Sequence, residues 1–190
     1  DTLEPAATPT RIKLFYTDKG LYFAADMIQD PRHLVERLSG RDQYVNRDRI
    51  SISIDASGEG LYAYWFAVNL GGSLMDGTIL PERDYSSNWD GPWRGASHRT
   101  ETGWSVEMLL PWSMMALPPS STGQRQIGVY IQRAVASIDE DWAYPALPRT
   151  QNQFLSQFPK TTISDIDPKQ QITFYPYVSS NWDQAADQTQ

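Results

Sequence analysis

Six residues in polar stretches of this chain combine flat aromatic rings with hydrogen-bonding groups. They are Tyr85, Trp89, Asp90, Trp93, Arg94 and Trp142. An aromatic face packs against the C–H side of a sugar ring, and carboxylate or guanidinium groups at the edge bind its hydroxyls. The pattern favours a non-catalytic site that binds an oligo- or polysaccharide by aromatic stacking.

Packing in the core is the second interpretation of the tryptophans. Three of them stand inside or beside apolar runs and are expected to be buried: Trp65, Trp104 and Trp112. Trp93 fits a core position as well as a binding position. Trp89 and Trp142 have polar neighbours, so binding and packing are equally open for these two.

Carboxylates offer two other kinds of chemistry. Asp48 and Asp76 stand at a strand end and a turn, where their oxygens could join a calcium site of about six to eight ligands. No Asp-x-Asp-x-Asp-Gly loop accompanies them, and most aspartates here suit turns. A glycosidase needs two carboxylates across a cleft. No spacing brings Glu107 or the run 139–141 into such a pair, so no enzymatic activity is expected.

Composition narrows the function further. The chain has 190 residues, a net charge of −7 and no cysteine. No cluster of Lys and Arg is present to track phosphates, which argues against nucleic-acid binding. The absence of cysteine excludes disulfides and thiolate catalysis. The length suits one domain over 1–168, followed by a C-terminal strand and tail, 169–190, at the junction to a following domain.

Short strands must position these side chains. The sequence alternates from Trp93 to Leu110 around a turn at 100–103, which predicts a β-hairpin that Pro111 ends. Alternating or apolar runs predict further strands at 11–16, 21–28, 48–55, 61–70, 73–80, 126–136, 161–167 and 172–178. Many short strands with little helix are typical of an all-β sandwich of antiparallel strands.

The remaining segments are expected to be helical turns and loops. Asp30 suits a helix cap and Pro31 a first helical position, which predicts one short helix that ends near Gly40. Single helical turns are expected within 112–117 and 153–158. Polar loops are expected at 82–88 and 139–150, and Asp76-Gly77 is expected to interrupt the strand at 73–80.

Several of these motifs occur in the order seen in a known family. They are LYFAADMIQDP, DRISISIDASGEGLYAYWFAVNLGGSLMDG, WDGPW, TGWSVEMLLPW and IGVYIQR. The chain resembles the family 9 carbohydrate-binding modules, a β-sandwich family related to the DOMON domains. It is more closely similar to modules at the N-terminus of large bacterial surface proteins that continue into an outer-membrane β-barrel. The resemblance covers roughly 10–177.

The resemblance implies sugar binding at the cell surface, in the outer membrane or in the periplasm of a Gram-negative bacterium. It implies a C-terminal barrel of the same protein as a partner, and structural calcium as a cofactor. The DOMON relatives suggest haem as a third function, for which Met75 and His98 are the pair of candidate ligands.

Two departures from the family pattern favour an alternative function. The family opens with Asp-Gly and Trp before its first strand, and these residues are absent here. Its sugar-binding members hold a sugar between two tryptophans, whose positions fall here at Tyr44 or Val45 and at Arg149 or Thr150. The alternative is a structural or interaction domain that docks on a barrel or another partner and binds no sugar.

Overall fold

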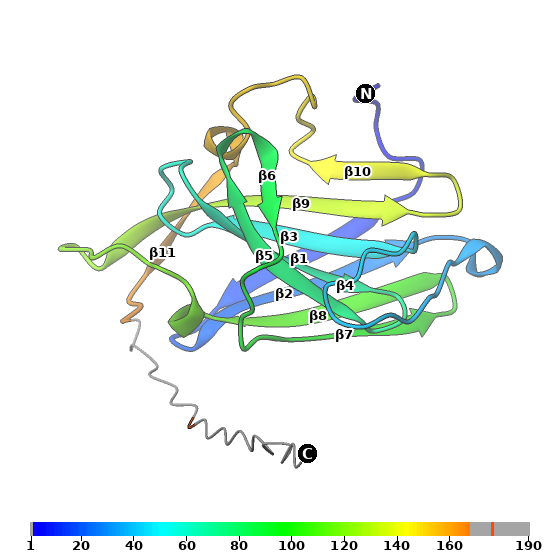
Figure 1. The fold of residues 1–190 in the computed structure, drawn as a ribbon, viewed down its shortest axis with the longest axis horizontal. Helices are drawn as coiled ribbons and strands as arrows, with labels where there is room; N and C mark the ends of the chain where they lie inside the picture. The colour runs from blue at the N-terminus through cyan, green and yellow to red at the C-terminus, as the bar shows by residue number, and fades with distance from the viewer. Residues whose placement is uncertain (1, 168–175, 177–190) are drawn as a thin grey trace, which may run out of the picture.

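Two antiparallel sheets pack face to face in the computed structural model, which describes residues 2–167 and Pro176 (Figure 1). Sheet A contains, in spatial order, β1 (Thr10–Tyr16), β2 (Gly20–Ile28), β8 (Gly103–Pro111) and β7 (Arg94–Thr100). Sheet B contains, in spatial order, β10 (Glu140–Tyr144), β9 (Gln124–Val135), β3 (Arg49–Asp55), β4 (Ala63–Asn69), β5 (Leu74–Leu80) and β6 (Asp84–Ser86), while β11 (Lys160–Ser164) pairs with the other end of β9. The expected β-sandwich is therefore confirmed.

The main core lies between the sheets and is built from alternate residues of each strand. Ile50, Ile52 and Ile54 of β3 are fully buried, and they belong to one cluster with Trp104 of β8. Because successive side chains of a strand point to opposite faces, the intervening residues of β3 face away from the core.

The predicted tryptophan hairpin is formed by β7 and β8, which pair from Arg94 opposite Leu109 to Thr100 opposite Gly103. Gly103 is required by the close approach of β2. A Cβ atom at this position would lie 2.0 Å from the carbonyl oxygen of Met27. The turn thus fixes both the hairpin and its pairing with β2.

A second, smaller core covers part of the outer face of sheet B. Its buried members are Ala63, Ile79, Tyr130, Phe154, Leu155 and Phe158. The last three come from the segment after β10, which carries the helical turn η4 (Leu155–Gln157) expected within 153–158. Residues near the C-terminal end of the described chain therefore cap one end of this face.

Three expected elements differ in the structure. The expected loops at 82–88 and 139–150 contain strands, β6 and β10. Strand β5 continues through Asp76-Gly77, which was expected to interrupt it. In all three cases pairing with a neighbouring strand supplies hydrogen bonds that the local sequence does not indicate.

The predicted helix after Asp30 is reduced to a single 3-10 turn, η1 (Pro31–His33). Asp30 does cap it, because its carboxylate accepts a hydrogen bond from the backbone N–H of Arg32. The chain then becomes extended, since the backbone of Val35 exchanges two hydrogen bonds with Asp48, one to its carboxylate and one from its N–H. These two tertiary hydrogen bonds outweigh the helical periodicity of the segment.

The other 3-10 turns are η2 (Pro81–Arg83) and η3 (Trp112–Met114), the latter as expected within 112–117. The expected strand at 172–178 and the expected junction at 169–190 lie outside the described residues, apart from Pro176. Within the described ranges, no helix has the length and apolar character that crossing a membrane requires.

Candidate functional site

A cleft of about 950 Å³ opens on the outer face of sheet B. Its walls come from β6, β9 and β10, from the segment Thr2–Ala7 and from the chain that follows β10. The residues that matter for its chemistry are Arg83, Tyr85, Tyr130, Gln132, Asp141, Trp142 and Arg149. We call this the sheet B cleft.

The twist of sheet B brings distant strands to one cleft. Three strands, β3, β4 and β5, separate the strand of Tyr85 from the strand of Tyr130, yet both side chains line the cleft. Neighbouring strands rotate by about 20–25°, so the short final strand β6 turns across the face of the sheet (Figure 1). The outer face is concave for this reason.

A close backbone approach holds β6 in this position. Gly77 of β5 leaves room for the carbonyl oxygen of Ser86, which would lie 1.9 Å from an added Cβ atom. The indole N–H of Trp65 donates to the same oxygen at 3.4 Å. The ring of Trp65 then meets Tyr85 edge to face, with 6.2 Å between centroids.

Tyr85 presents an aromatic surface to solvent. Its side chain is 45% exposed. Partial burial of its hydroxyl nevertheless raises the pKa of Tyr85 to about 12, with a smaller contribution from the nearby Tyr130. The phenol is therefore neutral at ordinary pH and can both donate and accept hydrogen bonds.

The floor of the cleft is rigid. Tyr130 stacks on Phe158 with 5.3 Å between ring centroids and meets Phe154 edge to face at 5.0 Å. The Arg83 guanidinium lies 3.8 Å from the centroid of Phe154 and donates to the carbonyl of Pro148 at 3.0 Å. These contacts fasten the segment after β10 to the sheet, so the cleft is preformed.

Trp142 lies at the β10 edge of the cleft, in a strand and not in the expected loop. It pairs with Arg133 of β9, whose guanidinium lies 5.1 Å from the ring centroid. The indole N–H donates to Glu140 Oε2 at 2.7 Å. One face of this partly buried ring is thus covered by Arg133, and the cation–π contact fixes its orientation on the inner side of sheet B, opposite to the face of Tyr130 and Gln132.

Polar groups stand beside the rings. Asp141 and Arg149 form an ion pair at 3.3 Å. Gln132 shares the outward face of β9 with Tyr130, and its side-chain amide makes no hydrogen bond recorded within the described ranges. An amide that can donate and accept, next to aromatic surface, suits the recognition of hydroxyl groups.

Two predicted tryptophans lie elsewhere, in the main core. Trp93 is 5% exposed and packs edge to face on Phe66 at 5.4 Å. Trp89 is half-buried, and its ring contacts Tyr64 at 4.9 Å and Phe66 at 6.0 Å. Trp93 has no exposed face for a ligand, and Trp89 is engaged mainly in packing.

The polar residues predicted beside those tryptophans are also away from the cleft. Asp90 is exposed and accepts a hydrogen bond from Arg41 Nε at 3.1 Å. Arg94 begins β7 on the outer face of sheet A. Of the six predicted binding residues, only Tyr85 and Trp142 line the sheet B cleft, and the ring of Trp142 lies on the Arg133 side of the sheet, away from Tyr85.

Asp48 is a structural anchor. It is fully buried, and its carboxylate accepts three hydrogen bonds of 2.9 Å, from the backbone N–H groups of Val35 and Ala136 and from the side chain of Gln29. Gln29 in turn accepts from Arg133 Nη2 at 2.9 Å. Both oxygens of this buried carboxylate thus already accept hydrogen bonds from the surrounding protein.

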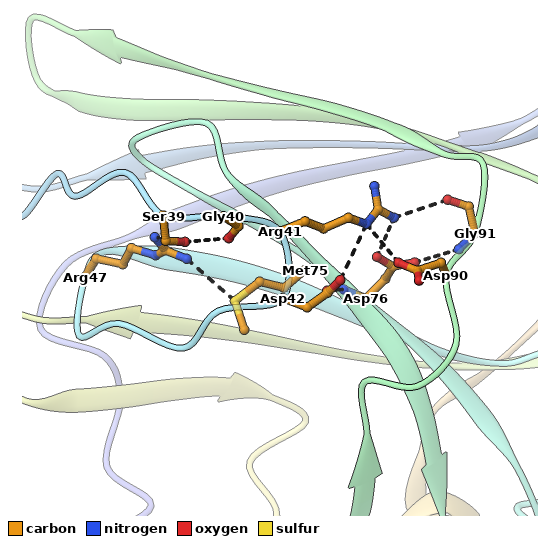
Figure 2. A network of polar contacts seen from close by, with 9 residues as sticks. All are labelled: Ser39, Gly40, Arg41, Asp42, Arg47, Met75, Asp76, Asp90 and Gly91. Atoms are coloured by element: carbon orange, nitrogen blue, oxygen red, sulfur yellow. Dashed lines mark hydrogen bonds and ion pairs between the residues drawn. The ribbon is translucent and has the colours of Figure 1, made fainter. Parts of the chain in front are cut away.

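Asp76 lies about two strands away, in a different cluster (Figure 2). Carboxylate oxygens of Asp42, Asp76 and Asp90 approach within 4.8 Å of one another. The guanidinium of Arg41 lies among them, at 2.5 Å from Asp76, 3.1 Å from Asp90 and 3.6 Å from Asp42. Burial raises the pKa of Asp76, partly offset by bonds from Gly91 and Arg41.

Arg41 occupies the place that a cation would take in this cluster. A calcium site needs about six to eight oxygens, and here three carboxylates already have an organic cation and a backbone N–H as partners. The residues do not fit structural calcium in this arrangement. Neither Asp48 nor Asp76, the two predicted ligands, belongs to an open oxygen-rich site.

The fold separates the two candidate haem ligands from each other, and it also separates the carboxylates that a glycosidase would need to bring together. Met75 lies on β5 of sheet B and accepts a hydrogen bond from Arg47 through its sulfur, whereas His98 lies on the outer face of sheet A. These two side chains cannot ligate one iron atom. Glu107 is on sheet A, and the acidic residues 139–141 adjoin sheet B.

Sequence reasoning missed Tyr130 and Gln132 as site residues. A signal existed in the strand QIGVYIQRAVA: the apolar residues Ile127, Val129 and Ile131 face the core, which places Tyr130 and Gln132 outward. Arg83 gave no such signal, because its role depends on an aromatic ring 71 positions later in the chain.

Comparisons with known proteins address the fold. No protein-family model matches the sequence, and no curated protein matches it. A family 9 carbohydrate-binding module from Caldicellulosiruptor kristjanssonii in complex with cellotriose is similar in structure, with a TM-score of 0.59 and 15% identity over 91% of this chain and 84% of that chain.

Two further solved structures agree. A protein from Bacteroides uniformis named as a candidate carbohydrate-binding protein gives a TM-score of 0.62 and 13% identity over 83% of this chain and 78% of that chain. A Caldicellulosiruptor kristjanssonii family 9 module in complex with glucose gives 0.54 and 15% identity over 83% and 77% of the two chains. The chain therefore has the fold of the family 9 carbohydrate-binding modules.

Proposed function

We propose that this domain is a non-catalytic carbohydrate-binding module whose ligand lies in the sheet B cleft. The observation that carries the proposal is the meeting of an exposed tyrosine ring, Tyr85, with the uncommitted amide of Gln132 on one concave face, with Trp142 at its β10 edge. The fold neighbours include modules solved with cellotriose and with glucose. A glucose-based oligosaccharide is therefore the first ligand to test.

Binding would combine stacking with edge contacts. A pyranose ring packs on Tyr85, and hydroxyls at its rim exchange hydrogen bonds with Gln132 and with the Asp141–Arg149 pair. Affinity should be weak, because the ring of Trp142 lies on the Arg133 side of the sheet, which leaves Tyr85 as the stacking surface, and an open cleft leaves much of a ligand hydrated. A surface or periplasmic location in a Gram-negative bacterium belongs to this proposal.

The experiment is calorimetric titration with cellotriose and glucose. Tyr85→Ala should abolish measurable heat, while Phe15→Ala, an exposed ring on sheet A, should leave it unchanged. Circular dichroism of each variant shows whether it is folded. A folded wild-type protein that binds neither sugar, nor any of a wider panel of soluble oligosaccharides, would refute the proposal.

One observation favours the alternative, an interaction domain. Strand β1 is an edge strand of sheet A and exposes Leu14, Phe15 and Tyr16 at 41%, 58% and 39%. Unpaired edges with apolar side chains are sites where another strand or protein docks. If Phe15→Ala raises solubility while no variant alters sugar binding, the interaction domain becomes the better proposal.

A further inference from the structure

The outer face of sheet A carries a second hollow, separate from the sheet B cleft. It has a volume of about 500 Å³. Its ionisable lining residues come from all four strands of the sheet: Arg11, Lys13, Asp26, His98 and Glu107. We call it the sheet A groove.

The register of the strands explains the hollow. One row across the sheet reads Lys13, Ala24, Glu107 and Ala96, and the next reads Arg11, Asp26, Ser105 and His98. The small side chains of these rows lie diagonally adjacent and form the floor. The long charged side chains stand on either side and form the walls.

The charges of the groove are not paired with one another. Arg11 stands directly opposite Asp26, yet no ion pair within 4.0 Å joins them, and none is recorded for Lys13 or Glu107 within the described ranges. Some exposed arginines elsewhere do pair with carboxylates, as Arg99 does with Glu36 at 2.6 Å.

Opposite charges face each other across the floor. Lys13 and Glu107 are separated by one intervening strand at Ala24, which places their backbones roughly 10 Å apart. No phenylalanine, tyrosine or tryptophan lines the groove, so a sugar ring would find no large stacking surface there. Recognition in this groove must be electrostatic, and a ligand must complement both its positive and its negative side chains.

We propose that the sheet A groove binds a small zwitterion of dipeptide size, with its carboxylate toward Lys13 and Arg11 and its ammonium group toward Glu107 and Asp26. An extended dipeptide spans roughly 7 Å, which fits between these side chains. This site goes beyond the proposed carbohydrate function and does not depend on it.

The test is a titration of ¹⁵N-labelled protein followed by two-dimensional NMR. Glycylglycine should shift the amides of Ala24, Ala96 and Ser105 in a saturable way, and the doubly capped analogue N-acetylglycylglycinamide should not. Because exposed ion pairs are worth at most about 1 kcal/mol, Lys13→Gln and Glu107→Gln should each weaken binding about fivefold.

Matched controls separate a local effect from a change in net charge. Lys160→Gln and Glu59→Gln remove the same charges at exposed positions outside the groove, and they should bind glycylglycine as the wild type does. Equal shifts with the capped dipeptide, with acetate or with glucuronate would overturn the zwitterion assignment. Absence of shifts with glycylglycine in the folded wild-type protein would overturn the site itself.

Discussion

Replacing Asp48 by Asn tests whether this carboxylate is a structural anchor or a metal ligand. The substitution keeps the shape of the side chain but exchanges one acceptor oxygen for an NH₂ group. In the structure both oxygens accept: Oδ1 from Ala136 N–H, and Oδ2 from Val35 N–H and from Gln29. Either orientation of the amide therefore places a donor against a buried donor.

The cost follows from these contacts. In the better orientation the amide oxygen keeps the two partners of Oδ2, and the bond from Ala136 is lost. Losing one hydrogen bond to a charged group costs about 1.5–3 kcal/mol, and the unsatisfied buried N–H adds about 1–3 kcal/mol. Removal of the negative charge also leaves Arg133, whose pKa burial lowers to about 10, without the compensating charge of Asp48. We expect Asp48→Asn to lower the free energy of unfolding by about 3–5 kcal/mol.

Urea unfolding in EDTA measures this loss directly. Since a domain of this size loses about 2–4 °C of Tm per kcal/mol, thermal unfolding should show the same destabilisation. Asp18→Asn, at an exposed turn, is the matched control and should change stability by less than about 0.5 kcal/mol. The anchor interpretation fails if Asp48→Asn is as stable as wild type in EDTA but loses a calcium-dependent stabilisation that the wild type shows.

Three further results are expected. Arg41→Met should destabilise the protein by about 1–3 kcal/mol at neutral pH, a value reduced because Arg41 is 38% exposed. Burial raises the pKa of Asp76, so its carboxylate is protonated in the folded state as the pH falls. The loss of stability in Arg41→Met should therefore shrink at acidic pH, because a protonated Asp76 no longer needs a cationic partner. A loss of stability that grows at acidic pH in urea titrations would contradict this. Gly77→Ala should displace β6, because the new Cβ would meet the Ser86 carbonyl. Calorimetry should then show sugar binding reduced as in Tyr85→Ala. Binding equal to that of the wild type would show that β6 does not position the site. Sugar binding should be constant between about pH 6 and 10, because burial raises the pKa of Tyr85 to about 12. A loss of binding with a midpoint near pH 10 in the same titration would contradict this prediction.

Much of the sandwich could be predicted because its strands carry their own periodicity. The alternation at 48–55 identifies the inward row of isoleucines, and the alternation around Gly103 identifies the tryptophan hairpin. In each case local pattern and tertiary burial agree. The order of motifs added the family-level fold, which the structural comparisons confirm.

The candidate site could be predicted only in part. Tyr85 stood out by residue type, but Trp89, Trp93 and Trp142 are aromatic residues in a similar polar setting. Trp89 and Trp93 pack in the core, and the ring of Trp142 lies on the Arg133 side of sheet B. The difference is which side of the sheet each residue reaches, and a loop of unknown path does not reveal this. The acidic residues gave the same ambiguity, because the sequence did not show that Arg41 lies among them.

The sequence by itself determined which residues are apolar, where strands alternate and where turns must form, since these depend on neighbours along the chain. Tertiary structure alone decided that the segment after Asp30 is extended, because Asp48 ties the backbone of Val35. It also decided the sheet B cleft, since β6 and β9 meet there only through the accumulated twist of the strands between them. Such contacts join residues far apart in sequence, and no local pattern encodes their geometry.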